Sequence, residues 1–181
     1  IEDYPGAYSL IPQSLDESLV CKSVYNWIRN PNQRPDGIVY VANKNNIRRN
    51  LYFLSQLLDI DIPVILLLNM DDIIEEYNKF DYIKLKNELN IEDVIPFSTI
   101  TNKGLKELKK SLSRLEKKSF LNVENVKMKL SDSLLEIVDS ITSTTKKVFS
   151  AKEDANKSLS LRFLCNPLHI NDIGLNKKDK H

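Results

Sequence analysis

The 181-residue sequence has only two cysteines, no long apolar segment and no signal peptide. Its longest purely apolar run, from Val64 to Leu68, is far shorter than the ~20 residues of a membrane-spanning helix. Because Cys21 and Cys165 are far apart and lack metal-ligand spacing, we expect two buried reduced thiols, with a disulfide as the alternative. These absences exclude a membrane-spanning helix within this sequence and favour a reducing compartment.

The sequence also lacks an excess of either charge. Lysine and arginine number 26 against 25 aspartates and glutamates, which gives a net charge of +1. This balance offers no electrostatic reason for a nucleic-acid or acidic-membrane partner, so we expect no nucleic acid to bind. With 41% hydrophobic and 28% charged residues, the composition is that of a soluble globular protein and not of a disordered one.

Hydrophobic spacing predicts strands that alternate with helices over the first two thirds of the chain. Strands are expected at 37–42, 63–68 and 94–97, and helices at 15–29, 46–59, 71–77, 82–89 and 103–117. Ser14 and Glu17 form a capping-box pattern before the first helix. The residues predicted for the buried side of that helix are Leu15, Leu19, Val20, Val24, Trp27 and Ile28. This alternation predicts a parallel sheet with helical crossovers, whereas residues 122–181 show helical spacing and no strand.

Three loops stand where an open parallel sheet binds ligands, and the first is Asp3-Tyr-Pro-Gly6. In a D-x-x-G loop of a nucleotide switch, the Asp holds Mg²⁺ through a water. The Gly amide approaches the γ-phosphate, where a side chain would interfere. A plain turn is the alternative interpretation of Asp3 and Gly6.

The second loop, Asn69-Met-Asp-Asp72, directly follows the apolar strand. The Asp72 carboxylate can accept hydrogen bonds from guanine N1–H and the 2-amino group. Adenine offers neither donor and would leave that carboxylate unpaired. Asn69 would contact the base edge and tie the neighbouring loops. The alternative is a helix N-cap formed by Asp71 or Asp72.

The third loop, Ser98-Thr99-Ile100, follows the last strand and can present a backbone amide to the guanine carbonyl. A polar strand-to-helix turn is the alternative interpretation. The three loops come in the order found in small GTPases, with one strand–helix unit between the second and the third.

Longer segments resemble one family, ferrous iron transport protein B. Residues 3–10 (DYPGAYSL) resemble its DLPGTYSL stretch, residues 46–52 (NIRRNLY) its NLERNLYL segment, and residues 62–72 (IPVILLLNMDD) its iPvvlaLNMmDe segment. Met70 is the choice of this family where most small GTPases have Lys. The resemblance covers residues 1–117, and the chain departs from the family pattern at Ala7, Asn43 and Thr99.

The resemblance implies an α/β fold, a partial small-GTPase (P-loop NTPase) parallel sheet with flanking helices, followed by a small all-helical domain. The domains implied are an incomplete GTPase domain at 1–118, a helical domain at 119–170 that resembles the family's GDP-dissociation-inhibitor region, and a polar tail at 171–181. The residues implied to bind GTP or GDP are Asp3, Gly6, Asn69, Met70, Asp72, Ser98 and Thr99, with Mg²⁺ held through Asp3.

In function, the resemblance implies the GTPase region of a bacterial ferrous iron transporter. GTP would be converted to GDP and phosphate, coupled to Fe(II) uptake. Its partner would be the membrane permease part of the same protein. The chain itself is expected to be soluble, at the cytoplasmic face of the inner membrane.

The phosphate-loop motif G-x-x-x-x-G-K-[ST] occurs nowhere in the sequence, which starts at Ile1 and not at Met. That loop cradles the phosphates and binds Mg²⁺. We therefore expect an N-terminally incomplete region, a slow GTPase in the intact parent and no activity in this chain alone. The alternatives are a nucleotide-independent interaction module or decayed GTPase and, third, another small GTPase. Met70 in place of Lys predicts weak affinity and quick nucleotide exchange.

Overall fold

The computed structural model describes residues 1–71, 80–117, 131–145, 156–157, 160–161 and 164. The chain divides into two compact units. The first consists of Ile1–Arg34 with Met128–His181, and the second of Pro35–Lys127.

A three-stranded parallel sheet forms the centre of the second unit. Its strands are β1 (Ile38–Asn43), β2 (Val64–Asn69) and β3 (Asp93–Pro96), and they lie in the order β1-β2-β3. The register pairs Asn43 with Asn69, so β1 and β2 end side by side. The expected parallel sheet is therefore confirmed.

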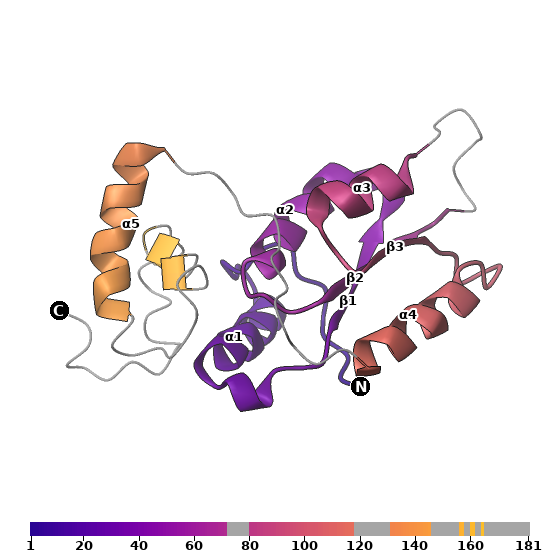
Figure 1. Cartoon of the computed structure of the whole chain (residues 1–181), viewed down its shortest axis with the longest axis horizontal. Helices are drawn as coiled ribbons and strands as arrows, with labels where there is room; N and C mark the ends of the chain where they lie inside the picture. Colours follow the sequence, from indigo (N-terminus) through magenta and orange to yellow (C-terminus); the bar gives the residue numbers. More distant parts are fainter. Residues whose placement is uncertain (72–79, 118–130, 146–155, 158–159, 162–163, 165–181) are drawn as a thin grey trace. The chain divides into compact units, whose positions relative to one another are not determined.

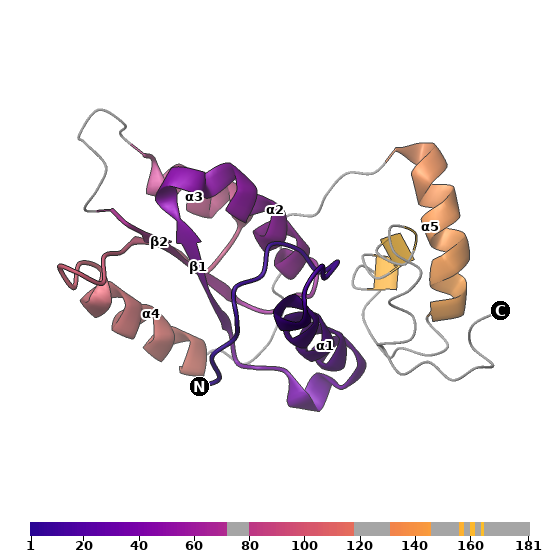
Figure 2. The ribbon, with the colours of Figure 1, turned by 180° about the vertical axis from the view of Figure 1, so that it is seen from behind.

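Helices cover both faces of this sheet, with α2 (Ile47–Leu58) and α3 (Tyr82–Leu89) on one face and α4 (Leu105–Lys117) on the other (Figures 1 and 2). On the first face Tyr40 of β1 meets Phe53 of α2 edge to face, with ring centroids 5.7 Å apart. On the second face the apolar side chains of α4 pack on those of β2 and β3; the residues involved are Ile65, Leu67, Ile95, Phe97, Leu108 and Leu115. Because both faces are covered, the middle strand must be apolar throughout, as residues 64–68 are.

The first unit begins with a loop that leads into α1 (Leu15–Arg29). The Ser14 hydroxyl caps this helix by accepting from the Glu17 amide at 3.2 Å. The Glu17 carboxylate accepts from the amides of Gln13 at 2.8 Å and Tyr8 at 3.3 Å. The predicted cap is thus confirmed, although Glu17 reaches back to Gln13 instead of to Ser14.

The buried stripe of α1 differs from the predicted one. Leu15 and Leu19 are 86% and 56% exposed, so their prediction as buried residues was wrong. The buried residues are Val20, Cys21, Val24, Tyr25 and Ile28. Tyr25 belongs to the buried side of the helix because its hydroxyl donates to the Leu10 carbonyl at 3.2 Å. Cys21 is buried as expected, and its thiol donates to the Ser9 carbonyl at 3.8 Å; Cys165 lies outside the described residues.

The later part of the first unit is helical at the described residues after Ser131. It contains α5 (Asp132–Thr145) and helical residues at 156–157, 160–161 and 164. The hydroxyls of Thr142 and Ser160 are 2.9 Å apart and buried. The expected all-helical segment is confirmed for these residues. The expected helix at 71–77 lies almost wholly outside the described residues, as does the tail at 171–181.

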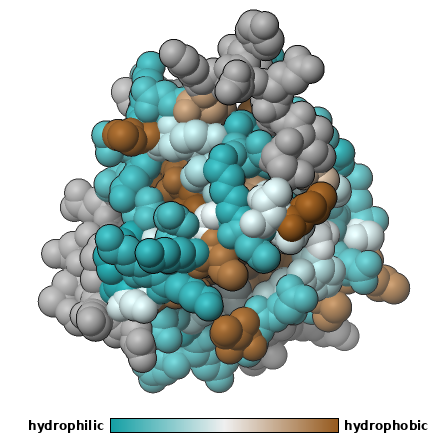
Figure 3. Space-filling model, turned by 90° about the vertical axis from the view of Figure 1, so that its right-hand side faces the viewer, coloured by the Kyte–Doolittle hydropathy of each residue, from teal (hydrophilic) through white to brown (hydrophobic). Residues whose placement is uncertain are grey.

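The face of the molecule shown in Figure 3 carries more hydrophilic than hydrophobic residues among those described. In the view of Figure 3 hydrophobic residues stand singly or in small groups among hydrophilic ones. Exposed large hydrophobic residues of the second unit include Met70, Ile83 and Ile100. Scattered exposed apolar residues of this kind are normal for globular proteins and do not define a docking surface.

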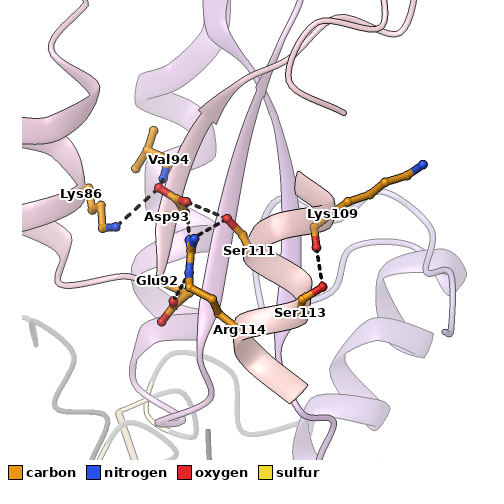
Figure 4. Close-up of polar contacts among 8 residues, drawn as sticks. All are labelled: Lys86, Glu92, Asp93, Val94, Lys109, Ser111, Ser113 and Arg114. Carbon is orange, nitrogen blue, oxygen red and sulfur yellow. Dashed lines mark hydrogen bonds and ion pairs between the residues drawn. The ribbon is translucent and has the colours of Figure 1, made fainter. Parts of the chain in front are cut away.

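A polar network joins α3, β3 and α4 around the Asp93 carboxylate (Figure 4). Ser111 and Arg114 of α4 each donate to Asp93 Oδ2 at 2.7 Å, and Lys86 of α3 lies 3.5 Å from Oδ1. Arg114 also donates to Glu92 at 3.2 Å. Burial by itself raises the pKa of Asp93, but these donors and charges outweigh it, so the pKa lies below its usual value.

Replacement of Asp93 should change how stability depends on pH. Because the folded-state pKa is lowered, the ionised carboxylate stabilises the fold above the ordinary pKa of about 3.9, and this stabilisation is lost as pH falls through the folded-state value. We expect Asp93→Asn to cost about 1–3 kcal/mol at neutral pH and to flatten the loss of stability in acid. Urea unfolding at a series of pH values measures both effects. Asp36→Asn, at an exposed turn residue, is the control, and an equal flattening there would contradict the assignment.

Replacement of Gly104 should also weaken the fold. Gly104, just before α4, has a φ of 80°, and an added Cβ would collide with the Pro96 carbonyl oxygen and lie 3.0 Å from the Ile95 side chain. We expect Gly104→Ala to lower the free energy of unfolding by about 1–3 kcal/mol, seen as a lower urea midpoint. Gly6→Ala is the matched control, because a Cβ on Gly6 meets no atom within 4 Å. Equal midpoints for the two variants would refute this account.

Candidate functional site

The loops that follow β2 and β3 are joined by backbone hydrogen bonds at the carboxyl edge of the sheet. The Phe97 amide donates to the Leu68 carbonyl at 2.9 Å, and the Asp71 amide donates back to the Phe97 carbonyl at 3.2 Å. These two hydrogen bonds bring the chain after Asn69 beside the chain before Ser98. The second and third loops predicted from the sequence therefore lie together.

The loop after β2 bends at once. Asn69 is the last residue of β2 and is half-buried, and Met70 follows with a φ of 64° and 38% of its surface exposed. A positive φ is uncommon for a residue other than glycine and marks a tight bend here. Asp72, the predicted base-reading carboxylate, lies outside the described residues.

The most heavily engaged side chain at this edge is Asp71. Its Oδ1 accepts from the Lys44 ammonium at 2.6 Å and from the Tyr82 hydroxyl at 2.8 Å. Its Oδ2 accepts from the Lys103 ammonium. The Asp71 and Lys44 side chains are only 5% and 9% exposed, whereas that of Lys103 is 55% exposed. One buried carboxylate thus takes donors from three other segments of the chain.

The charges at this edge are mutually stabilised. Burial by itself raises the pKa of Asp71, but hydrogen bonds from Lys103, Lys44 and Tyr82 outweigh it and lower the pKa to about 2. Burial lowers the pKa of Lys44, yet its bonds to Asp71 and Tyr82 leave that pKa above its usual value. Both groups are therefore ionised throughout the neutral pH range.

The loop after β3 is closed by its own hydrogen bonds. Ser98 is fully buried, its amide donates to the Lys103 carbonyl at 3.2 Å, and its hydroxyl accepts from the Thr101 amide at 3.3 Å. Asn102 has a φ of 57°, which turns the chain toward α4. Thr99 is exposed at the tip. Ser98 therefore shapes the loop, and Thr99 is the residue that the loop presents.

The D-x-x-G loop belongs to the first unit. Asp3 and Gly6 are both exposed. Between them, the Tyr4 ring packs edge-on against Trp27, with ring centroids 5.8 Å apart. The structure brings Asn69, Met70, Ser98 and Thr99 together in the second unit. The nucleotide-binding roles given to these residues, like those given to Asp3 and Gly6, remain predictions.

Sequence reasoning missed Lys44, Tyr82 and Lys103. A signal was present, because Lys44 follows β1 and Lys103 follows β3, so both had to stand at the same edge as Asp71. Opposite charges at neighbouring strand ends predict an ion pair once the strand order is known. The order of the strands was the missing information.

Two further classes of site are not found in the part of the chain that is described. No group of three or more His, Cys, Asp or Glu side chains there could hold a metal ion. None of the described helices combines the length and the apolar character that crossing a membrane requires.

Comparison with known proteins agrees with the resemblance seen in the sequence. Residues 1–112 match the model of a family described as ferrous iron transport protein B. The chain is 37% identical over 109 residues to an Fe(2+) transport protein A/Fe(2+) transporter FeoB fusion protein of Porphyromonas gingivalis, covering 60% of this chain and 12% of that protein. It is 35% identical over 129 residues to the Fe(2+) transporter FeoB of Escherichia coli K12, covering 68% of this chain and 16% of that protein.

Solved structures show the same fold. The cytosolic domain of L. pneumophila FeoB superposes with a TM-score of 0.73 at 26% identity, covering 94% of this chain and 71% of that one. The apo cytosolic domain of T. maritima FeoB gives a TM-score of 0.75 at 22% identity, covering 98% and 69%.

The chain spans about one sixth or less of the length of these curated relatives. The family model nevertheless matches more than half of the chain, up to residue 112, and the expected P-loop GTPase fold is the one shared with the solved cytosolic domains. This chain therefore belongs to the ferrous iron transport protein B family.

Proposed function

We propose that this chain forms the guanine-reading part of a GTP/GDP site in a ferrous iron transporter. The observation that carries the proposal is the pair of backbone hydrogen bonds that Phe97 makes with Leu68 and Asp71. Through these bonds the chain that follows Asn69 lies beside the chain that leads into the Ser98–Thr99 loop. Two loops at adjacent strand ends can surround one edge of a base. Solved relatives from S. thermophilus, described as bound to GDP and to mGMPPNP, add support from the same fold.

The contacts of Asp71 favour its neighbour as the base reader. Three donors already occupy the Asp71 carboxylate, so Asp72 is the carboxylate left for guanine N1–H and the 2-amino group. The Ser98 amide already donates to Lys103, which leaves the Thr99 amide for the guanine carbonyl. Met70, exposed beside Asn69, would lie along the base plane.

The phosphate side of the site requires groups beyond these. Asp3 would hold Mg²⁺ through a water, and the Gly6 amide would approach the γ-phosphate. The 181 residues contain no phosphate-loop motif, so this chain by itself should hold a nucleotide mainly by its base. In the whole transporter, conversion of GTP to GDP and phosphate would be coupled to Fe(II) passage through the membrane part. The helical segment would slow GDP release.

Asp72→Asn should change the preferred base from guanine to xanthine. Xanthine carries a carbonyl where guanine carries the 2-amino group, so an Asn amide fits xanthine and a carboxylate fits guanine. We expect the unmodified chain to bind GDP about tenfold more tightly than XDP, with the reverse order for Asp72→Asn, since one lost hydrogen bond costs about 1.4 kcal/mol or more. Shifts of amide signals in NMR titrations give the affinities, with ADP as the base control.

Asp36→Asn serves as the matched control, because Asp36 is exposed before β1 and lies at the opposite end of the strands. It should leave the order of the bases unchanged. Equal affinity of the unmodified chain for GDP, XDP and ADP would contradict the proposal and favour a nucleotide-independent interaction module.

The chain alone should neither retain GTP tightly nor hydrolyse it, because positioning and charge neutralisation of the phosphates need the missing loop. We expect a dissociation constant for a fluorescent GTP analogue above ~0.1 mM and phosphate release at the level of the blank. A dissociation constant in the micromolar range would contradict this prediction, and so would phosphate release that Asp72→Ala abolishes.

A further inference from the structure

Among the described residues, the segments that follow β1 and β3 and the start of α3 all donate to the Asp71 carboxylate at the carboxyl edge of the sheet. Lys44 opens the turn after β1, Asp71 lies in the loop after β2, Lys103 lies in the loop after β3, and Tyr82 is the first residue of α3. Lys44, Tyr82 and Lys103 lie 27, 11 and 32 positions from Asp71 in the sequence. Asp71 is thus the only described carboxylate to which Lys44, Tyr82 and Lys103 are seen to donate together.

The two lysines have different environments. Lys44 is buried, donates to the Tyr82 hydroxyl at 2.9 Å, and lies 5.5 Å from the centre of the Tyr82 ring. Breaking its bond to Asp71 would leave a buried ammonium with the Tyr82 hydroxyl in place of a carboxylate, which is costly. Lys103 is more than half exposed, so its ammonium can leave Asp71 and be hydrated. Lys44 is therefore a fixed anchor, and Lys103 is the contact that can open.

We propose that Asp71 is a positioning residue that, through Lys103, holds the loop after β3 against the loop after β2 and so aligns the two base-reading loops. This inference rests on the proposed function. The Asp71 carboxylate does not touch the base. It acts through the backbone of the loop at 98–104. Lys103 lies near the end of this loop, and Thr99 is exposed at its tip.

The ion pair between Lys103 and Asp71 should persist at neutral pH and weaken as the salt concentration rises. With its pKa near 2, Asp71 keeps its charge at any pH in which the fold is ordinarily studied. The Lys103 contact is largely exposed and is therefore screened by salt, whereas the buried Lys44 contact is screened much less. Salt thus separates the contribution of Lys103 from that of Lys44.

Lys103→Met tests the tie in the complete 181-residue chain, because it removes the ammonium and keeps most of the side-chain length. We expect amide hydrogen exchange to become severalfold faster in the loop at 98–104 and at the end of β2, with α2 unaffected. Lys103→Arg should restore protection, and the difference between Lys103→Met and the unmodified chain should shrink as salt rises toward ~1 M. Lys106→Met, an exposed lysine in the first turn of α4, is the matched control.

In the nucleotide titrations, Lys103→Met should weaken GDP and XDP binding together, by about three- to tenfold, and leave the ratio of their affinities unchanged. A positioning residue changes the affinity, whereas the base reader changes the preference. Lys106→Met should change neither quantity.

The outcomes separate this inference from the proposed function. Exchange in Lys103→Met equal to that of the unmodified chain, or an equal acceleration in Lys106→Met, overturns the tie whether or not GDP binds. A change in the base preference of Lys103→Met overturns the positioning role. The tie is supported if Lys103→Met accelerates hydrogen exchange, Lys103→Arg does not, and high salt removes the difference. That result would stand even if equal binding of GDP, XDP and ADP had overturned the proposed function.

Discussion

The central strand β2 is buried on both faces, and the second unit is organised around this constraint. Its residues from Val64 to Leu68 are at most 3% exposed, so their backbone amides and carbonyls must find partners within the sheet. Parallel neighbours on both sides meet that requirement, and helices have to cover both faces. The crossovers that connect parallel strands then place every strand-to-helix loop at one edge.

Two carboxylates stabilise the unit at opposite ends of these strands. Asp93, at the start of β3, joins α3 and α4 to the sheet, as Figure 4 shows. Asp71, beyond the end of β2, joins the loops after β1 and β3. Each receives several charged or hydroxyl donors, which offset the cost of burying a carboxylate. The end that carries the family motifs is also the end at which one contact, that of Lys103, is exposed enough to open.

The proposed nucleotide site would need precise loops more than reactive side chains. Reading a base depends on the placement of a few donors and acceptors, and an error of about 1 Å weakens each hydrogen bond steeply. Gly104, Ser98 and the left-handed residues Met70 and Asn102 fix the course of these loops by backbone geometry. The Asp71 tie would add a long-range restraint between loops that are far apart in sequence.

The amino-acid sequence by itself determined the local elements and the family. The apolar run of β2, the Ser14 cap and the helical spacing of α3 depend on residues within a few positions of one another, so periodicity and side-chain chemistry were sufficient. Motifs around Asp3, Asn50 and Met70 were specific enough to identify the family.

Only the tertiary structure decided which face of α1 is buried and which charges meet. Leu15 and Leu19 satisfy helical spacing, but Tyr25 and Cys21 occupy the interior in their place. Lys44 and Lys103 lie 27 and 32 positions from Asp71, and their places after strands do not by themselves show that they meet the same carboxylate. They meet because parallel pairing of three strands brings the carboxyl ends to one edge, and that pairing is a property of the folded chain as a whole.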